Sequence, residues 1–257
     1  MSPHSAVTKT KGDKNLMSVI TNRGKAAAES ANKKKIDFKK LYIRLKDGES
    51  VRVRVPSAEE YVEYMAHGSY DLGIYTQPCI LPTGSRCAYD EVVRHINDDL
   101  GITKDDKDHP LQPFRALYAK KRYLFALYDL DEQMIRLFDA TNDQAKGLIA
   151  SIEEYADSVG ELAFKFARTG DKSATTYTLS PILKLKSEDK EKFDAFTGGV
   201  DENLYEEALM PRTFEQQIEE LQKAGLPADI IKTLFGDAIE EEAKPIDEGP
   251  EDPSKGF

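Results

Sequence analysis

Tryptophan is absent from the 257-residue sequence, cysteine occurs twice and histidine four times, and no apolar run is long. Two cysteines cannot form the several disulfides that staple small secreted domains, so that class is excluded. A membrane helix needs about 18 or more consecutive apolar residues, and the N-terminal residues also lack the apolar run of a secretory signal. We therefore expect a cytosolic protein that keeps its thiols reduced.

Familiar catalytic motifs are also missing. The sequence has no G-x-x-x-x-G-K phosphate loop, no G-x-G-x-x-G, no G-x-S-x-G and no H-E-x-x-H. Adjacent acids such as Asp105-Asp106 and Glu153-Glu154 are more typical of solvated loops and helix faces than of acid–base pairs. These absences favour a binding protein over an enzyme.

Charge is distributed unevenly along the chain. The 46 acidic and 36 basic residues give a net charge of −10, yet residues 1–40 hold ten Lys or Arg and three acids, a net +7. Residues 237–257 hold eight acids and two lysines with few apolar residues, so we expect a disordered acidic tail. Residues 113–128 contain four basic residues and no acid. A basic patch on an acidic protein indicates a polyanion site, although gatekeeper lysines on a strand edge are an alternative.

Two strands are predicted most clearly at the start of the central region. Residues 41–46 alternate apolar and polar side chains, residues 51–55 do the same, and an Asp47-Gly48 turn signal separates them. We therefore predict a hairpin that buries aliphatic side chains on one face and exposes Tyr and Arg on the other.

Further strand and helix signals follow in alternation. Strands are predicted over 117–130, 134–140, 162–168 and 175–186, and strands or a crossing loop over 61–65 and 70–80. Helices are predicted over 87–100, 141–155, 187–196, 202–209, 213–224 and 227–235. Thr141 and Gln144 have the spacing of a capping box. This order indicates an α+β protein, mainly β, with an OB-like Greek-key barrel core. The expected divisions are a basic flexible arm (1–40), an OB-like core (41–186), a helical appendage (187–236) and the acidic tail (237–257).

His67, Cys79, Cys87 and Asp90 form a candidate metal site. One imidazole, two thiolates and one carboxylate can supply the four tetrahedral positions that Zn²⁺ prefers, and Cys87-x-x-Asp90 resembles a zinc knuckle with one ligand exchanged. His95 is an alternative fourth ligand. Because this spacing is not diagnostic by itself, buried thiols beside a surface histidine, without metal, are the competing interpretation.

Aromatic and basic residues are interleaved on several predicted strands. A protein that binds single strands needs cations that follow the phosphates and aromatic rings on which bases stack. The candidate residues are Tyr42, Arg44, Arg52, Arg54, Arg115, Tyr118, Lys120, Lys121, Arg122, Tyr123, Lys165, Arg168 and Tyr177. Any one tyrosine is more often a core residue, but the same mixture on several strands favours a binding surface. We expect one phosphate-tracking surface made of Arg44, Arg52, Arg54, Lys120, Lys121 and Arg122.

These features resemble the single-stranded DNA-binding, or helix-destabilising, proteins of phages of the T-even type. The resemblance covers roughly residues 40–190 and rests on the hairpin over 42–55, on His67-Gly68 with the two cysteines that follow, and on the segment KKRYLF at 120–125. The resemblance implies an OB-fold, a structural zinc and a basic aromatic cleft for DNA. Members of the family use a histidine and three cysteines for zinc, whereas this chain has Asp90 in place of the third cysteine.

The resemblance also implies roles for the two ends of the chain. In that family a basic N-terminal arm mediates cooperative self-contact on DNA, and an acidic C-terminal tail contacts replication proteins. We expect the same here, with Phe257 as the candidate partner-binding residue of the tail. The predicted function is coating and protection of exposed DNA strands in phage replication, recombination or repair, in the host cytoplasm. Two alternatives stay open: an acidic-tailed interaction module or scaffold without nucleic-acid binding, and a nuclease or other metal-dependent enzyme that uses Asp90 and the cysteines.

Overall fold

The computed structural model describes residues 24–25, 37–201 and 203–242. The chain divides into two units, residues 1–37 and 38–257, and all the helices and strands from Phe38 onward belong to the second. Most of the expected basic arm lies outside the described residues, and so do Phe257 and most of the expected acidic tail.

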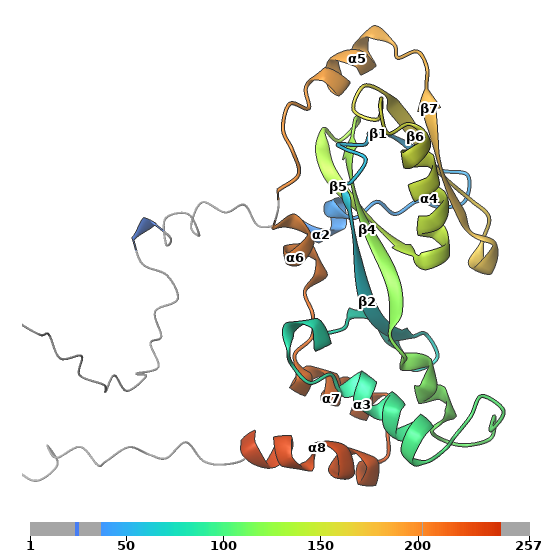
Figure 1. Ribbon diagram of the computed structural model, residues 1–257, viewed down its shortest axis with the longest axis vertical. Coiled ribbons are helices and arrows are strands. Elements are labelled where there is room, and N and C mark those ends of the chain that lie inside the picture. Colours follow the sequence, from blue (N-terminus) through green and yellow to red (C-terminus); the bar gives the residue numbers. More distant parts are fainter. Residues whose placement is uncertain (1–23, 26–36, 202, 243–257) are drawn as a thin grey trace, which may run out of the picture. The chain divides into compact units, whose positions relative to one another are not determined.

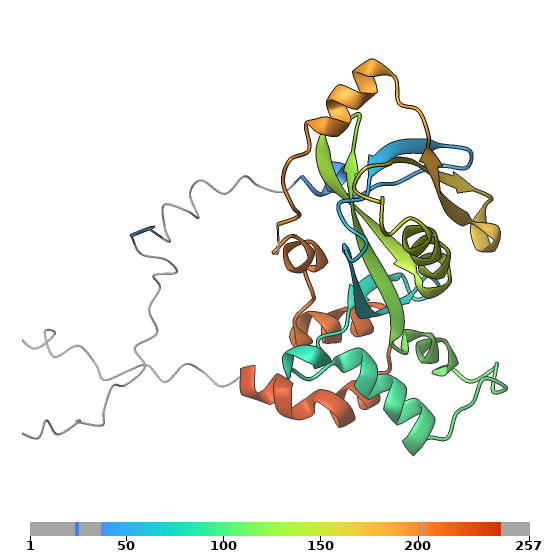
Figure 2. The same ribbon diagram turned by 45° about the horizontal axis from the view of Figure 1, so that its top comes forward.

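Seven antiparallel strands in the described part of the chain form one sheet that curls into a half-barrel (Figures 1 and 2). The strands are β1 Ser50–Arg54, β2 Tyr61–Ser69, β3 Ile74–Pro78, β4 Lys120–Asp129, β5 Met134–Thr141, β6 Ala163–Thr169 and β7 Thr176–Ile182. Their order in space is β3-β2-β4-β1-β6-β7, and β5 pairs with the other edge of β4. The fold is therefore α+β and barrel-like, as expected from the sequence at that level.

The first apolar core lies between one face of the half-barrel and helix α4 (Asn142–Glu154). Because side chains alternate along a strand, β1, β4, β5 and β6 each send every second residue into this core, including Val53, Phe125 and Phe166. The predicted capping box starts α4, since Thr141 and Gln144 exchange hydrogen bonds between side chain and backbone. The helix therefore begins where its buried face, with Leu148, can meet the sheet.

The predicted hairpin over 41–55 is wrong in its pairing. Residues 41–46 bury alternate side chains, and Gly48 adopts the left-handed φ of 77° that the turn requires. However, β1 pairs with β4 and β6, and residues 41–46 do not form a strand beside it. Alternation showed which face of each segment would be buried, but it contains no information about the partner strand.

Residues 42–48 instead bridge two strands of the half-barrel. The Ile43 N–H donates to the Leu137 carbonyl of β5 at 2.8 Å, and the Gly48 N–H donates to the Arg168 carbonyl of β6 at 3.0 Å. We call residues 42–48 the closure segment, because it connects β5 and β6, which are not paired with each other.

A second apolar core lies beyond the β2–β3 hairpin. Its helices are α3 (Ala88–Arg94, continued by a wider turn over His95–Asp99), α7 (Phe214–Lys223), α8 (Ala228–Glu242) and the 3₁₀ helix Gln112–Leu117. Tyr89 of α3, Leu221 of α7 and Phe235 of α8 are completely buried together in it. The expected appendage over 187–236 is therefore not a separate attachment, because α7 and α8 share their core with α3.

Two further short helices pack against the sheet. Helix α5 (Ser187–Asp194) packs through Phe193 on Tyr128, and helix α6 (Leu204–Leu209) accepts a hydrogen bond from the Tyr42 hydroxyl at the Ala208 carbonyl, at 3.0 Å. Helix α8 continues to Glu242, so the expectation of a disordered tail from residue 237 is wrong for residues 237–242.

Candidate nucleic-acid interface and metal cluster

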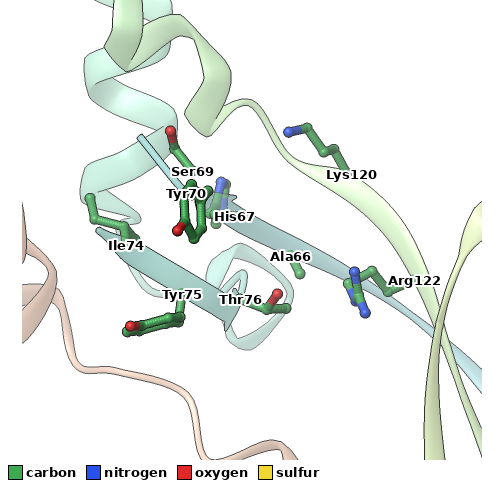
Figure 3. Close-up of a pocket in the computed structure, with 10 residues that line it drawn as sticks. Ala66, His67, Ser69, Tyr70, Ile74, Tyr75, Thr76, Lys120 and Arg122 are labelled. Atoms are coloured by element: carbon green, nitrogen blue, oxygen red, sulfur yellow. The ribbon is translucent and has the colours of Figure 1, made fainter. Parts of the chain in front are cut away.

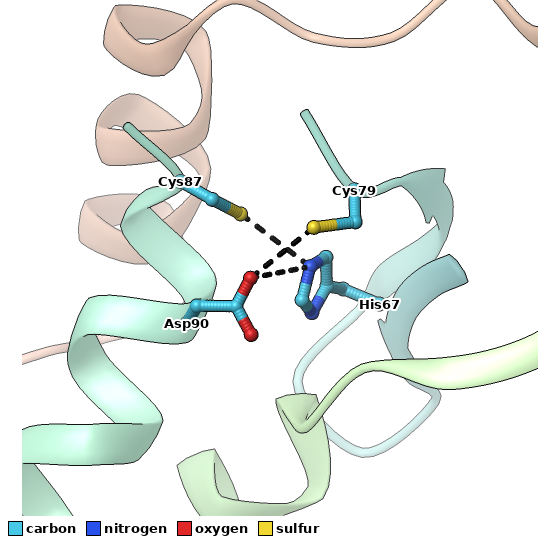
Figure 4. Close-up of side chains that lie close together, drawn as sticks. All are labelled: His67, Cys79, Cys87 and Asp90. Atoms are coloured by element: carbon cyan, nitrogen blue, oxygen red, sulfur yellow. Dashed lines mark hydrogen bonds and ion pairs between the residues drawn. The ribbon is translucent and has the colours of Figure 1, made fainter. Parts of the chain in front are cut away.

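Four side chains selected by their spacing meet beside α3 (Figure 4). The ligand atoms of His67, Cys79, Cys87 and Asp90 all lie within 4.8 Å of one another. His67 Nε2 lies 3.4 Å from Asp90 Oδ2 and 3.4 Å from Cys87 Sγ, and Cys79 Sγ lies 3.2 Å from Asp90 Oδ2. An imidazole nitrogen, two sulfurs and a carboxylate oxygen around one centre fit the donor preference of Zn²⁺.

Local structure explains why these residues meet. His67 lies near the end of β2, Cys79 follows β3 directly, Cys87 is the N-cap of α3 and Asp90 lies in its first turn. The Nδ1–H of His67 donates to the Leu117 carbonyl at 2.7 Å. This bond fixes the tautomer and leaves Nε2 directed at the cluster, as in histidine ligands of zinc sites.

The ionisable side chains of the cluster shift one another's pKa values. Burial lowers the pKa of His67, but contacts with Asp90, Cys87 and the Leu117 carbonyl outweigh burial and raise the pKa to about 10. Burial raises the pKa of the Cys79 thiol to about 12. Burial also raises the pKa of Asp90, yet the contact with His67 prevails and lowers it. A metal ion that bound here would displace the thiol protons and any second proton on His67.

The alternatives for this site can be compared with the geometry. His95 is not a member of the cluster, and its Nδ1 lies 2.8 Å from Asp99 Oδ2 instead. The competing interpretation expects packed thiols beside a surface histidine. Cys87 is buried, as that interpretation expects, but His67 is buried too and is not a surface residue.

An open hollow lies beside the β2–β3 hairpin (Figure 3). We call it the hairpin hollow; its volume is about 310 Å³, and its lining is Ala66–Tyr70, Ile74–Thr76, Lys120 and Arg122. Tyr70 and Tyr75 expose 94% and 80% of their surface. Exposed rings next to a cation are the elements from which sites for single strands are built.

A second hollow adjoins the first. We call it the closure hollow; its volume is about 530 Å³, and its lining is Tyr42–Leu45, Tyr64, Tyr75, Thr76, Pro78, Phe138, Asp139, Arg168, Tyr177, Ala208 and Leu209. Tyr75 and Thr76 line both hollows, so the two are neighbours, and we call them together the groove.

Four predicted site residues line the closure hollow, namely Tyr42, Arg44, Arg168 and Tyr177. Three of them also hold its walls together. Arg168 donates to the Leu45 carbonyl at 2.7 Å, the Tyr42 hydroxyl is bonded to α6, and the Tyr177 ring packs on Phe138 with centroids 4.4 Å apart. Arg44 is the exposed one of the four.

The basic run on β4 is divided between the two faces of the sheet. Lys120 and Arg122 pair in register with Ala66 and Tyr64 and line the hairpin hollow. Lys121 and Tyr123 point to the opposite face, where both contact Glu63, at 3.1 Å and 2.6 Å. Successive side chains of a strand alternate in this way, so the expected surface cannot contain Lys121 together with its neighbours.

Arg52 and Arg54 also do not belong to the groove, because they hold α5. Arg52 forms ion pairs with Asp131 and Asp189, the latter at 2.5 Å. Arg54 donates to the carbonyls of Phe193 and Phe196 at 3.1 Å and 3.0 Å. These two arginines therefore do not share a surface with Lys120, contrary to the expectation of one surface.

The remaining predicted residues lie at or beyond the edge of the groove. Arg115 donates to Asn97 at 2.7 Å, and Lys165 is an exposed residue of β6 that lines neither hollow. Tyr118 is exposed, and its ring centre lies 4.6 Å from Lys120 Nζ.

Sequence reasoning missed Tyr64, Tyr70 and Tyr75, which line the groove. Tyr70 begins the turn of the β2–β3 hairpin, where the Gly73 N–H donates to its carbonyl at 3.0 Å. The signal available in the sequence was a pair of tyrosines on either side of a glycine turn, a place where rings are seldom covered.

Comparisons with models of known protein families and with curated proteins found no match. In the described part of the chain, no helix combines the length and apolar character needed to cross a bilayer. The assignment of function therefore depends on the geometry of the groove and the cluster.

Proposed function

We propose that the protein binds single-stranded DNA in the groove formed by the hairpin hollow and the closure hollow. The observation that carries this proposal is the presence of two almost fully exposed rings, Tyr70 and Tyr75, in the same open hollow as Lys120. Unpaired bases can stack on these rings while the ammonium group neutralises phosphate. Duplex DNA hides the faces of its bases, so it cannot use the rings.

The biological role that fits this chemistry is coating of exposed strands in phage replication, recombination or repair, without catalysis. The net charge of −10 does not oppose it, because affinity depends on local cations and released counterions. In this proposal the half-barrel is of the OB type, the basic arm promotes self-association along DNA, and the tail with Phe257 binds replication proteins.

We further propose that the cluster of His67, Cys79, Cys87 and Asp90 holds a structural Zn²⁺. Four protein ligands leave no open coordination position, which is typical of structural rather than catalytic zinc. The ion would tie the β2–β3 hairpin to α3. It would thereby fix the hairpin that presents Tyr70 and Tyr75 to the groove.

The neighbouring lysines of β4 provide a matched test. Binding of a labelled oligo-dT and of a duplex of equal length is measured across a salt series for wild type, Lys120→Ala and Lys121→Ala. We expect tight binding of oligo-dT only, and a salt slope that falls by about 0.7 in Lys120→Ala, because one phosphate contact is lost. Lys121→Ala keeps the wild-type slope, since its side chain lies on the opposite face.

Two results would contradict this proposal. Equal slopes in the two lysine variants would remove the hairpin hollow from the binding site. Failure of the wild type to bind oligo-dT even at low salt would favour the alternative of an acidic-tailed interaction module or scaffold.

A further inference from the structure

Arg122 and Asp139 form an ion pair where the two hollows meet. Arg122 lines the hairpin hollow and Asp139 lines the closure hollow. Arg122 Nε donates to Asp139 Oδ1 at 2.9 Å, and the Tyr64 hydroxyl donates to the same oxygen at 3.0 Å. The side chains of Arg122 and Asp139 are 20% and 24% exposed. The pair is thus held in place from three strands and keeps an open side toward the groove.

Lys120 provides a contrast on the same face of the same strand (Figure 3). Its ammonium group donates to the Ala116 carbonyl at 3.1 Å and has no acidic partner among the residues that the structure describes. A phosphate near Lys120 therefore meets uncompensated positive charge. A phosphate near Arg122 meets a pair with no net charge, and Asp139 is the one acid that lines either hollow in the described chain.

The hydrogen-bonding capacity of the pair identifies the ligand that it suits. Phosphate oxygens are only acceptors, so a phosphate at this point would be repelled by the Asp139 carboxylate. The edge of a nucleobase presents donors and acceptors side by side. It can donate to Asp139 while it accepts from the N–H groups that Arg122 still has available.

We propose that the Arg122–Asp139 pair contacts the edges of nucleobases, whereas Lys120 contacts phosphates; this assignment rests on the proposed function. Tyr75 lines both hollows, so a strand that stacks a base on its ring passes through the hollows that the pair also lines. The bases of the DNA strand then face Arg122 and Asp139, and its phosphates lie toward Lys120. Asp139 acts here as a positioning residue for Arg122 and as an acceptor for the base.

The test compares oligo-dT with an abasic oligonucleotide of the same length, across a salt series. The double variant Arg122→Ala/Asp139→Asn removes both charges of the pair, so it weakens binding of oligo-dT about tenfold, the usual size for a lost hydrogen bond to a charged group, and leaves abasic binding and the salt slope unchanged. Lys120→Ala weakens binding of both oligonucleotides by the same factor and lowers the slope by about 0.7. Lys121→Ala changes neither.

Two further variants separate orientation from charge. Arg122→Lys keeps the charge but not the planar donor group, so it loses oligo-dT affinity as the double variant does. Asp139→Asn leaves Arg122 uncompensated, so the salt slope steepens by about 0.7 and abasic binding tightens. For each variant, the affinity for oligo-dT is divided by the affinity for the abasic oligonucleotide. A smaller folded fraction lowers both affinities equally and cancels from this ratio.

Three outcomes would overturn the inference while the proposed function stands. One is an equal loss on both oligonucleotides in the double variant, and another is full oligo-dT affinity in Arg122→Lys, since both describe a phosphate contact. The third is unchanged binding in the double variant, which would place the pair outside the site. If the wild type binds neither oligonucleotide, the proposed function itself fails.

Discussion

At the scale of single residues, neighbours in sequence have different roles because a strand alternates its side chains. Lys120 faces the groove, Lys121 forms an ion pair with Glu63 on the other face, and Arg122 faces the groove but is neutralised by Asp139. Three consecutive cations therefore contribute one uncompensated charge to the groove. A count of basic residues in the sequence overestimates the electrostatic part of binding for this reason.

Tyr75 is the residue on which stacking depends most, because its exposed ring lines both hollows. Tyr75→Ala should weaken binding of oligo-dT by about 1–3 kcal/mol, the range measured for a stacked base. Tyr75→Phe is the control, since it keeps the ring and removes only the hydroxyl. Titration of a fluorescent oligonucleotide measures both, and equal losses in the two variants would mean that the hydroxyl, not stacking, is responsible.

At the scale of elements, α5 is attached to the sheet by ion pairs as well as by the packing of Phe193. Asp131, in the turn between β4 and β5, contacts Arg52 of β1 and, at 3.4 Å, Lys192 of α5. The hydrogen bond from Arg52 lowers the pKa of Asp131 below its ordinary value of 3.8, with a smaller contribution from Lys192. The ionised carboxylate therefore stabilises the folded state.

This attachment should weaken in acid. A depressed folded-state pKa adds stability that is fully present above pH 3.8 and is lost as the pH falls further, through the folded pKa. We expect Asp131→Asn to unfold at a lower temperature than wild type at neutral pH, and the difference to vanish well below pH 3.8. Asp194→Asn is the control, because Asp194 pairs with Lys190 inside α5. A difference that persists in acid would show that packing, not charge, is lost.

The candidate metal cluster of His67, Cys79, Cys87 and Asp90 joins three elements, so a bound metal ion should stabilise the second core. Treatment with a strong chelator should lower the melting temperature. The free energy of unfolding should fall by about 2.7 kcal/mol if free zinc had been present at a hundredfold excess over its Kd. Cys87→Ser should remove this response, and His95→Ala, on the same helical segment but outside the cluster, should keep it. Elemental analysis should find one zinc per wild-type chain, and well under one would favour packed thiols.

Elements defined by local signals were predictable, and the pairing of distant segments was not. The capping box of α4 and the turn at Asp47-Gly48 depend on residues close in sequence, and the structure contains both. The partner of residues 41–46 depends on β5 and β6, which lie far along the chain. Periodicity has no access to such contacts.

The same limit applies to the candidate site. His67, Cys79, Cys87 and Asp90 fall within a short stretch, so their spacing alone was enough to find the cluster. Arg52 and Arg54 matched the pattern of a phosphate-binding strand, but α5 covers them from residues far along the chain. Exposure of Tyr70 and Tyr75 likewise depends on what the rest of the chain leaves uncovered.

At the scale of the whole molecule, the two cores determine where the chain can be shortened. Phe235 is completely buried in the second core and α8 continues to Glu242, so truncation after Gly236 would cut a helix. Truncation after Glu242 removes four acids and two lysines. The repulsion between this segment and DNA is screened by salt.

We therefore expect removal of residues 243–257 to tighten binding of oligo-dT at low salt and to have no effect at high salt. The gain should be small, because the segment has a net charge of only −2. Binding isotherms of the full and shortened chains at several salt concentrations measure it. A gain that is equal at every concentration would mean that the segment acts by steric exclusion.

The closure segment also gives the fold a mechanical property. Its hydrogen bonds to β5 and β6, through Ile43 and Gly48, are separated by a few residues and are not part of a long ladder. Tension applied to the chain ahead of Phe38 would load the Ile43 hydrogen bond first and the Gly48 hydrogen bond second, so the two would break one after the other. Because residues 42–45 line the closure hollow, such a pull would widen that hollow.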